Sequence, residues 1–194
     1  MLLNSLRQLN WLDIFILIII LRICYIASKT GLPSEFFKFI GTLLASCVSM
    51  HYYVAISDSV RALVPVIKDI PAEVLDFVIF LTLAIGTYLV FVVLRNITNN
   101  LLKIEAVSTL NKWGGLLLGS LRSLFLVSFI VFVMAVSPVN YLKLSVKHSY
   151  FGPRVFSVST GTYNWLCENL FSKLSGKDSR NKAVLEIEKE FTKR

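Results

Sequence analysis

Residues 110–135 read LNKWGGLLLGSLRSLFLVSFIVFVMA, and this segment predicts a membrane-spanning helix that carries its own interfacial anchor. Lys112 and Trp113 stand at its start, and both residue types gather where a bilayer meets water. The apolar run behind them has roughly the 20 residues that cross the hydrocarbon layer. Small residues recur at every fourth position, on one helix face where another backbone can approach closely: Gly115, Gly119 and Ser123.

Arg122 lies about eight residues into the same apolar run, which is about 12 Å of helix rise. A charged side chain at that depth needs a partner or contact with water. Two interpretations stay open. The guanidinium reaches back to headgroups or bonds backbone carbonyls, or it lines a polar path through the membrane.

Composition places the whole chain in a bilayer. Of the 194 residues 55% are hydrophobic and 16% are charged, and the mean hydropathy is +0.68. Charged residues make up about a quarter of an ordinary soluble domain. The formal charge of +8 does not indicate nucleic-acid binding, because lysine and arginine flank the apolar segments and follow the C-terminal tail. Membrane flanking and anionic headgroups account for these residues, so we expect the lipid bilayer as a partner and no nucleic acid.

The three cysteines, Cys24, Cys47 and Cys167, indicate buried thiols. They form no Cys-x-x-Cys pair and have no histidine at metal-ligand spacing, so we expect neither a metal ion nor a cofactor. His51 and His148 have no evident nucleophile, base or paired acid beside them. An intramembrane enzyme is therefore the least favoured class, and we expect no catalytic residue.

Hydropathy and turn signals predict an all-α membrane protein with four transmembrane helices, interfacial amphipathic helices and a short charged C-terminal helix. The expected spans are residues 11–27, 36–56, 74–94 and 114–135. We divide the chain into a four-helix transmembrane domain, residues 1–140, and an amphipathic, charged tail, residues 141–194.

Several segments outside the spans are expected at or beyond the membrane surface. Residues 57–71 are polar and predict a loop, whereas residues 95–112 keep one apolar side and predict a helix lying along the surface. The stretches 141–150 and 162–174 are weakly amphipathic and are expected in the headgroup layer. Residues 179–194 predict a short, partly frayed helix.

The first span begins with a capping signal. Asn10 can cap the helix, and Asp13 three residues later faces the free amides of the first turn, close to a capping box. Alternatively, Asp13 is an ionisable group at the mouth of a polar pathway, since carboxylates inside spans are costly and often functional. Arg22 lies on the opposite helix face, so it does not pair with Asp13 on one helix.

The second span begins after Gly31 and Pro33 break the chain, and Glu35 there favours the positive end of the helix dipole. This span carries its own small residues at every fourth position: Gly41, Ala45 and Ser49. Two such stripes, one here and one in the fourth span, predict that these helices pack together or that one packs on its copy in an oligomer.

Four spans put both termini on one side of the membrane. The opposite side has basic residues in its two loops and near its helix ends, and the intramembrane arginines lean the same way: Lys29, Lys38, Arg95, Lys103, Lys112, Arg22 and Arg122. The terminal side has nearly as many: Arg7, Arg61, Lys68, Lys143, Lys147 and Arg154. Because cytoplasmic loops carry the excess of lysine and arginine, the two arginines inside the spans tip this comparison slightly toward extracytoplasmic termini.

Three groups of residues resemble the colicin V production protein (CvpA) family of bacterial inner-membrane proteins. The first is NWLDIFILIIIL, with Asn10, Trp11 and Asp13. The second is formed by Gly31, Glu35 and Gly41. The third is LNKWGGLLLGSLRS, with Leu110, Asn111, Gly115, Gly119 and Arg122. Together with the four-span layout they cover about the first 140 residues.

The chain departs from the family pattern at two places. Where the family tends to show a basic residue and a glycine before the second span, this chain has Lys29, Thr30 and Gly31. Where a glycine often follows the arginine of the fourth span, Ser123 stands here. Some family members carry a serine protease domain after the fourth span, but the residues that follow here contain no Gly-x-Ser-x-Gly and no triad-like set.

The resemblance implies a multi-pass protein of the bacterial plasma membrane, linked to production or export of the toxin colicin V and to envelope stress tolerance. Two functions are compatible with the residues. One is a non-enzymatic assembly or scaffold factor whose partners are other membrane proteins or a second copy, as the small-residue stripes suggest. The alternative is a small oligomeric channel or transporter in which Arg22 and Arg122 line a polar path with Glu35 near its mouth.

Overall fold

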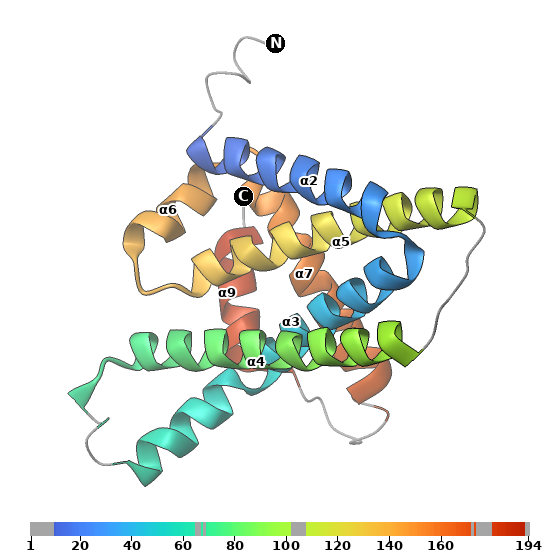
Figure 1. Ribbon diagram of the computed structural model, residues 1–194. Coiled ribbons are helices and arrows are strands. Elements are labelled where there is room, and N and C mark those ends of the chain that lie inside the picture. Colours follow the sequence, from blue (N-terminus) through green and yellow to red (C-terminus); the bar gives the residue numbers. More distant parts are fainter. Residues whose placement is uncertain are drawn as a thin grey trace.

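The computed structural model describes residues 10–64, 67, 69–101, 108–171, 173 and 180–192. Within those ranges the chain is helical and contains no strand, which confirms the all-α class (Figure 1). Four long helices come first: α2 (Trp11–Thr30), α3 (Leu32–Leu63), α4 (Ala72–Leu101) and α5 (Ser108–Val136). Shorter helices follow: α6 (Asn140–His148), α7 (Gly152–Leu166), the π-helical turn η2 (Cys167–Phe171) and α9 (Lys182–Thr192).

The four long helices are each long and apolar enough to cross a bilayer, as predicted. Their outer faces are apolar and open. On α4, for example, Ile85 and Leu89 leave 58% and 55% of their surface exposed, and on α2 the exposed fraction of Leu21 is 61%. Exposing apolar surface to water costs about 25 cal/mol of free energy per Å². Rows of such side chains therefore need an apolar neighbour, which lipid hydrocarbon or another membrane helix supplies.

Two predicted connections are helical in the structure. The polar loop expected at residues 57–71 is wrong for its first half, because α3 continues to Leu63 and the Val64 amide still donates to the Val60 carbonyl. Polar side chains such as Asp58 and Arg61 do not require a loop, because a helix end that extends beyond the membrane exposes them to water. The surface helix expected at residues 95–112 is divided between the end of α4 and the start of α5, and residues 102–107 lie outside the described ranges.

The long helices pack in an order that the chain order does not suggest. α3 lies along α4 and also contacts α5, whereas α2 lies along α5 and barely touches α3, although only Gly31 separates these two helices (Figure 1). The fourth span is therefore central, with α2 on one flank and α3 on another.

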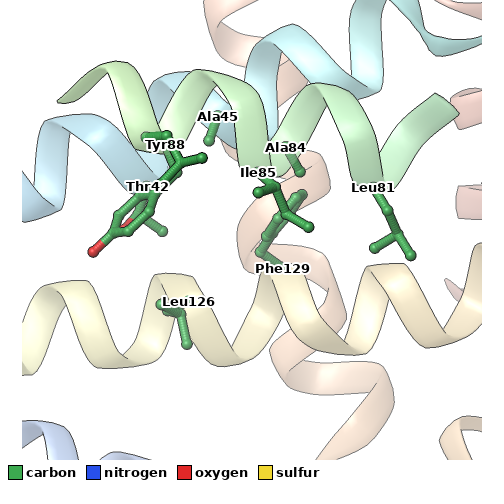
Figure 2. Close-up of a pocket in the computed structure, with 9 residues that line it drawn as sticks. Thr42, Ala45, Leu81, Ala84, Ile85, Tyr88, Leu126 and Phe129 are labelled. Carbon is green, nitrogen blue, oxygen red and sulfur yellow. The ribbon is translucent and has the colours of Figure 1, made fainter. Parts of the chain in front are cut away.

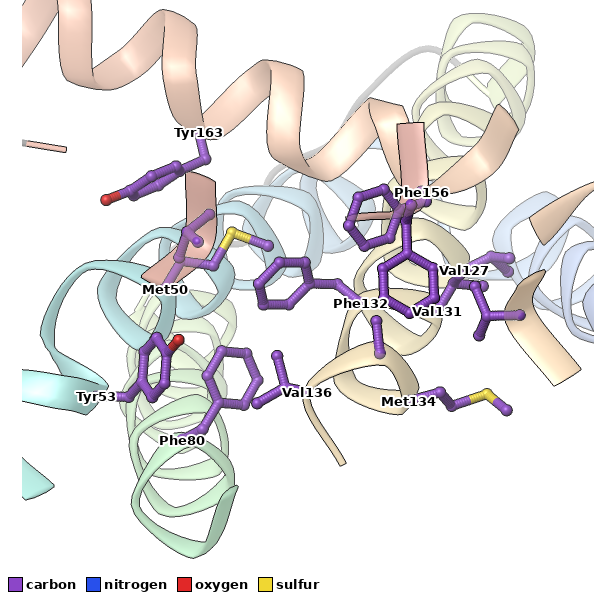
Figure 3. Packing of buried hydrophobic residues seen from close by; sticks show 14 of the residues in the cluster. Met50, Tyr53, Phe80, Val127, Val131, Phe132, Met134, Val136, Phe156 and Tyr163 are labelled. Carbon is purple, nitrogen blue, oxygen red and sulfur yellow. The ribbon is translucent and has the colours of Figure 1, made fainter. Parts of the chain in front are cut away.

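A ladder of aromatic rings forms the core and extends into the C-terminal helices (Figure 3). Ring centroids lie 5.7 Å apart for Phe80 of α4 and Phe132 of α5, 5.7 Å for Phe132 and Phe156 of α7, and 5.4 Å for Phe156 and Phe191 of α9. Offset or tilted rings at this spacing attract each other beyond the area that they bury. The hydrophobic core is thus continuous across residue 140, where the sequence analysis ended the four-helix domain.

Helix α7 packs on the long helices. Most of it lies between the two stretches, residues 141–150 and 162–174, that the sequence analysis placed in the headgroup layer. Its Ser159 amide donates to the Ser128 hydroxyl of α5 over 2.7 Å, and Phe156, Thr160 and Tyr163 are buried. The helix begins at Gly152, and its buried face carries hydroxyl-bearing and aromatic residues. Such a face has a weaker apolar pattern than a face of leucines. The Trp165 side chain near the end of this helix is 60% exposed.

Candidate functional site

Gly31 forms the entire connection between α2 and α3. Its φ of 79° lies in the region that side-chain-bearing residues rarely adopt, so glycine allows the chain to reverse within one residue. The side chain of Asn111, at the start of the apolar part of α5, accepts a 2.7 Å hydrogen bond from the Leu32 amide. It satisfies one of the free amides at the start of α3 and fixes the turn against α5.

The small-residue stripe of α5 faces α2 and this turn. A Cβ on Gly115 would lie 3.1 Å from the Ala27 carbonyl oxygen and 3.0 Å from the Gly31 carbonyl carbon, and one on Gly119 would lie 2.0 Å from the Ala27 Cβ. One turn further, Cys24 Sγ lies 3.6 Å from Ser120 Oγ and 4.0 Å from the buried Ser123 Oγ. Backbones approach here because no side chain separates them.

The helices that carry the two stripes, α3 and α5, pack together as predicted, but their glycines face other neighbours. On α3 a Cβ at Gly41 would lie 2.8 Å from the Phe91 Cβ, so that stripe begins against α4. Ala45 and Ser49 follow it and are buried. Helices α3 and α5 do touch, but through large side chains such as Phe39 and Phe125, whose ring centroids are 6.5 Å apart. Periodicity identifies which face of a helix is packed and does not identify its partner.

Glu35 and Arg122 meet in the interior next to this junction. Glu35 has no exposed surface and Arg122 exposes 7%. Arg122 Nε lies 3.0 Å from Glu35 Oε2, and the other carboxylate oxygen accepts from Lys38 Nζ at 2.6 Å and Thr30 Oγ1 at 2.5 Å. The partner that the sequence required for Arg122 is thus Glu35, and the carboxylate also lies in the first turn of α3, where the helix dipole favours it.

The contact between Arg122 and Glu35 is electrostatic and lacks a directed hydrogen bond. The two atoms are at ion-pair distance, yet neither Nε nor Oε2 has a hydrogen-bond partner of good geometry among the described residues. With Lys38, the cluster holds two cations against one carboxylate. Removing one member of such a buried pair leaves an uncompensated charge and typically costs about 3–5 kcal/mol.

Arg22 does not join this cluster. Its side chain is exposed, and Cys24 two residues later faces α5. Two residues turn a helix by about 200°, which directs Arg22 away from α5 and from Arg122. The two arginines therefore do not line a shared path within one chain.

Asp13 anchors the other end of α2. It completes the predicted capping box with Asn10 and is 2% exposed. Its carboxylate also accepts from Ser149 Oγ at 2.5 Å and from the Tyr150 and Phe151 amides at 3.2 and 2.8 Å, in the turn that precedes α7. The sequence predicted the cap but gave no sign of this partner, because the turn is far away along the chain.

The histidine that the sequence left without an evident partner contacts the C-terminal helices. His51 Nδ1 lies 3.3 Å from the Tyr163 hydroxyl, which also accepts from the Asn181 amide at 3.0 Å. Burial raises the pKa of Tyr163, so its hydroxyl stays neutral and available for these bonds. Among the described residues no group of three or more His, Cys, Asp or Glu side chains could hold a metal ion.

Four apolar helices joined through small residues, with their interior charges paired, describe a multi-pass helical membrane protein. The family model described as colicin V production protein matches residues 12–160, from the capped start of α2 to the middle of α7. The chain belongs to this family. Neither a search of the curated proteins nor a search of the solved structures found a match.

Proposed function

We propose that this protein is a non-enzymatic assembly or scaffold factor of the bacterial plasma membrane that supports production or export of colicin V or a similar toxin. The family supplies the link to colicin V production. The assembly role is supported chiefly by the use of the interior polar groups. Glu35, Arg122 and Asp13 are each engaged in joining helices, and the outer faces offer apolar surface to lipid or to another membrane protein.

The proposal places both termini outside the cytoplasm. The turn between α2 and α3 has Lys29 and Lys38 beside it and Arg95 and Lys112 at the neighbouring helix ends, and the arginines inside the spans tip a close charge comparison toward this end. A C-terminal alkaline phosphatase fusion should therefore be active, and a C-terminal fluorescent protein that matures only in the cytoplasm should be dark. The opposite pair of results contradicts this topology.

A small oligomeric channel is the second candidate, and Arg22 is the residue that favours it. An exposed guanidinium on an otherwise apolar helix face needs water, headgroups or another copy of the chain. Within one chain Arg122 is paired with Glu35, and Arg22 points away from both. A polar path that includes Arg22 therefore needs a second copy of the chain.

Two assays on the full-length protein separate these functions. Affinity purification from native membranes after crosslinking should recover a reproducible set of membrane proteins, and liposomes that contain the purified protein should show no ion or solute flux above empty liposomes. Arg122→Gln and Arg22→Gln test the buried and the exposed arginine separately. Flux that either substitution abolishes would establish the channel and overturn the assembly role. The absence of any specific partner would also overturn the assembly role.

A further inference from the structure

An apolar groove of about 260 Å³ lies between α3, α4 and α5 (Figure 2). It exists because the side chains that face each other there are short: Thr42 and Ala45 on α3, and Ala84 on α4. Leu126 and Phe129 of α5 form its opposite wall. Helices α4 and α5 touch at few points, so the gap between them is not closed.

The groove opens toward the surroundings of the helix bundle. Ile85 and Leu89 stand at its edge and are more than half exposed, on the same apolar face of α4 that fits hydrocarbon. Almost all of its lining is apolar, and a water molecule needs two to four polar partners to stay in such a site. A hydrocarbon chain, which is already the neighbouring medium, has no such requirement.

One end of the groove is basic. Lys38 is one helical turn before Thr42, Arg122 is one turn before Leu126, and Arg95 is two turns beyond Tyr88 on the antiparallel α4. Lys38, Arg95 and Tyr88 also line a common small recess between α3 and α4, next to the groove. The Tyr88 hydroxyl points toward this end, away from Leu81 at the other (Figure 2).

The charges at this end do not cancel. Lys38 and Arg122 both contact the carboxylate of Glu35, whereas Arg95 contacts Asn96, so among the described residues this end has three cations and one carboxylate, an excess of two positive charges. Lys38 has three N–H donors and Arg95 has five, so their bonds to Glu35 and to Asn96 leave donors for a further acceptor.

We propose that this groove binds one acyl chain of an anionic phospholipid, whose phosphate lies between Lys38 and Arg95 with the Tyr88 hydroxyl as a third donor. The apolar part accounts for the chain, and the charge excess selects a lipid of net negative charge over a zwitterionic one. The site does not depend on the assembly role, because a channel or a scaffold would hold the same lipid.

Native mass spectrometry of the delipidated full-length protein tests the site. Phosphatidylglycerol should bind as one tightly held molecule, about tenfold more strongly than phosphatidylcholine with the same acyl chains. Ala84→Leu fills the groove and should abolish the tight site. Gly86→Leu adds a larger side chain two residues away, where a Cβ meets nothing within 4 Å, and should leave binding unchanged.

The headgroup contacts are tested separately with Lys38→Gln combined with Arg95→Gln. The double substitution should reduce the preference for phosphatidylglycerol to less than about twofold while retaining chain binding, whereas Arg22→Gln should not change the preference. Equal binding of the two lipids by the unsubstituted protein would overturn the proposal. So would oleate binding as tightly as phosphatidylglycerol, because the ligand would then be a free fatty acid.

Photocrosslinking of the unsubstituted protein removes any dependence on how the variants fold. Phosphatidylglycerol that carries a diazirine on its acyl chain should label α4 between Leu81 and Leu89 and α5 near Leu126, the walls of the groove. Labelling spread evenly over the exposed faces of α2 and α4 would show ordinary solvation by lipid and would contradict a built site.

Discussion

At the scale of single residues, the interior charges of this protein serve to join elements that are distant in the chain. Glu35 and Arg122 connect α3 to α5, and Asp13 connects α2 to the turn before α7. The sequence indicated that Asp13 and Arg122 are costly inside a span and assigned Glu35 to the positive end of a helix dipole, and it placed the cap of Asp13 correctly. It could not identify the partners, because an ion pair between helices depends on packing that the order of residues does not reveal.

Charge removal at the ion pair should be strongly destabilising and non-additive. We expect Glu35→Gln to lower the free energy of unfolding by about 3–5 kcal/mol, because it leaves Arg122 buried beside a neutral group. Arg122→Gln should cost less, since Lys38 still pairs with the carboxylate. The double variant should cost clearly less than the sum of the two. Thermal unfolding in detergent, followed by tryptophan fluorescence, measures all three, and strictly additive losses would contradict the pairing.

Asp13→Asn should loosen the turn before α7 without unfolding the bundle. The substitution retains the size of the side chain but removes the charge that accepts bonds from Ser149, Tyr150 and Phe151, each of the charge-assisted kind that contributes about 1.5–3 kcal/mol. Hydrogen exchange at the Phe151 amide should accelerate. Ser149→Ala removes one bond and is the milder comparison. An unchanged exchange rate would mean that the turn is held by α5 alone.

At the scale of elements, the small-residue stripes decide how closely the helices approach. The sequence predicted both stripes from their four-residue spacing, and the structure buries both. In the structure the stripe of α5 packs on α2, and the start of the α3 stripe packs on α4; the sequence predicted neither partner. A helix face of small residues allows close approach by whichever helix the connecting turns place beside it. The one-residue turn at Gly31 determines this pairing, because it holds the end of α2 and the start of α3 against the same part of α5.

Gly119→Ala should separate α2 from α5 and lower the free energy of unfolding by about 1–3 kcal/mol, because the new Cβ would overlap that of Ala27. Ala27→Gly in the same chain should restore most of the loss by reopening the space. Gly161→Ala adds a methyl group where nothing lies within 4 Å and serves as the control. If Ala27→Gly deepened the loss instead, the two residues would not be in direct contact.

At the scale of the whole molecule, the C-terminal helices complete the core of the spans. Phe156 and Phe191 extend the ring ladder from α5 to α9, and Val184 is fully buried. The sequence predicted the four spans because hydropathy alone reveals them. It treated residues 141–194 as a surface tail because short helices with mixed polarity look alike whether they lie on lipid or on protein.

Phe191→Ala should therefore destabilise the entire protein and not α9 alone. Removing a buried phenyl ring costs about 3–5 kcal/mol, and this ring packs on Phe156 in the core. The transition temperature of the spans, measured by circular dichroism in detergent, should fall together with that of α9. Phe151→Ala removes a ring that is 42% exposed and should have a much smaller effect. Separate melting of α9 would instead mark residues 182–192 as an independent unit.

The one-residue connection at Gly31 also has a consequence for biogenesis. Two spans joined by so short a turn enter the bilayer together, so Glu35 arrives in the membrane before the fourth span, which carries Arg122, is inserted. Until then the carboxylate depends on Thr30 and Lys38, the two partners that belong to the first two spans. Lys38 thus acts as a temporary counterion and Thr30 as a hydrogen-bond donor, which together lower the cost of the carboxylate in the early intermediate.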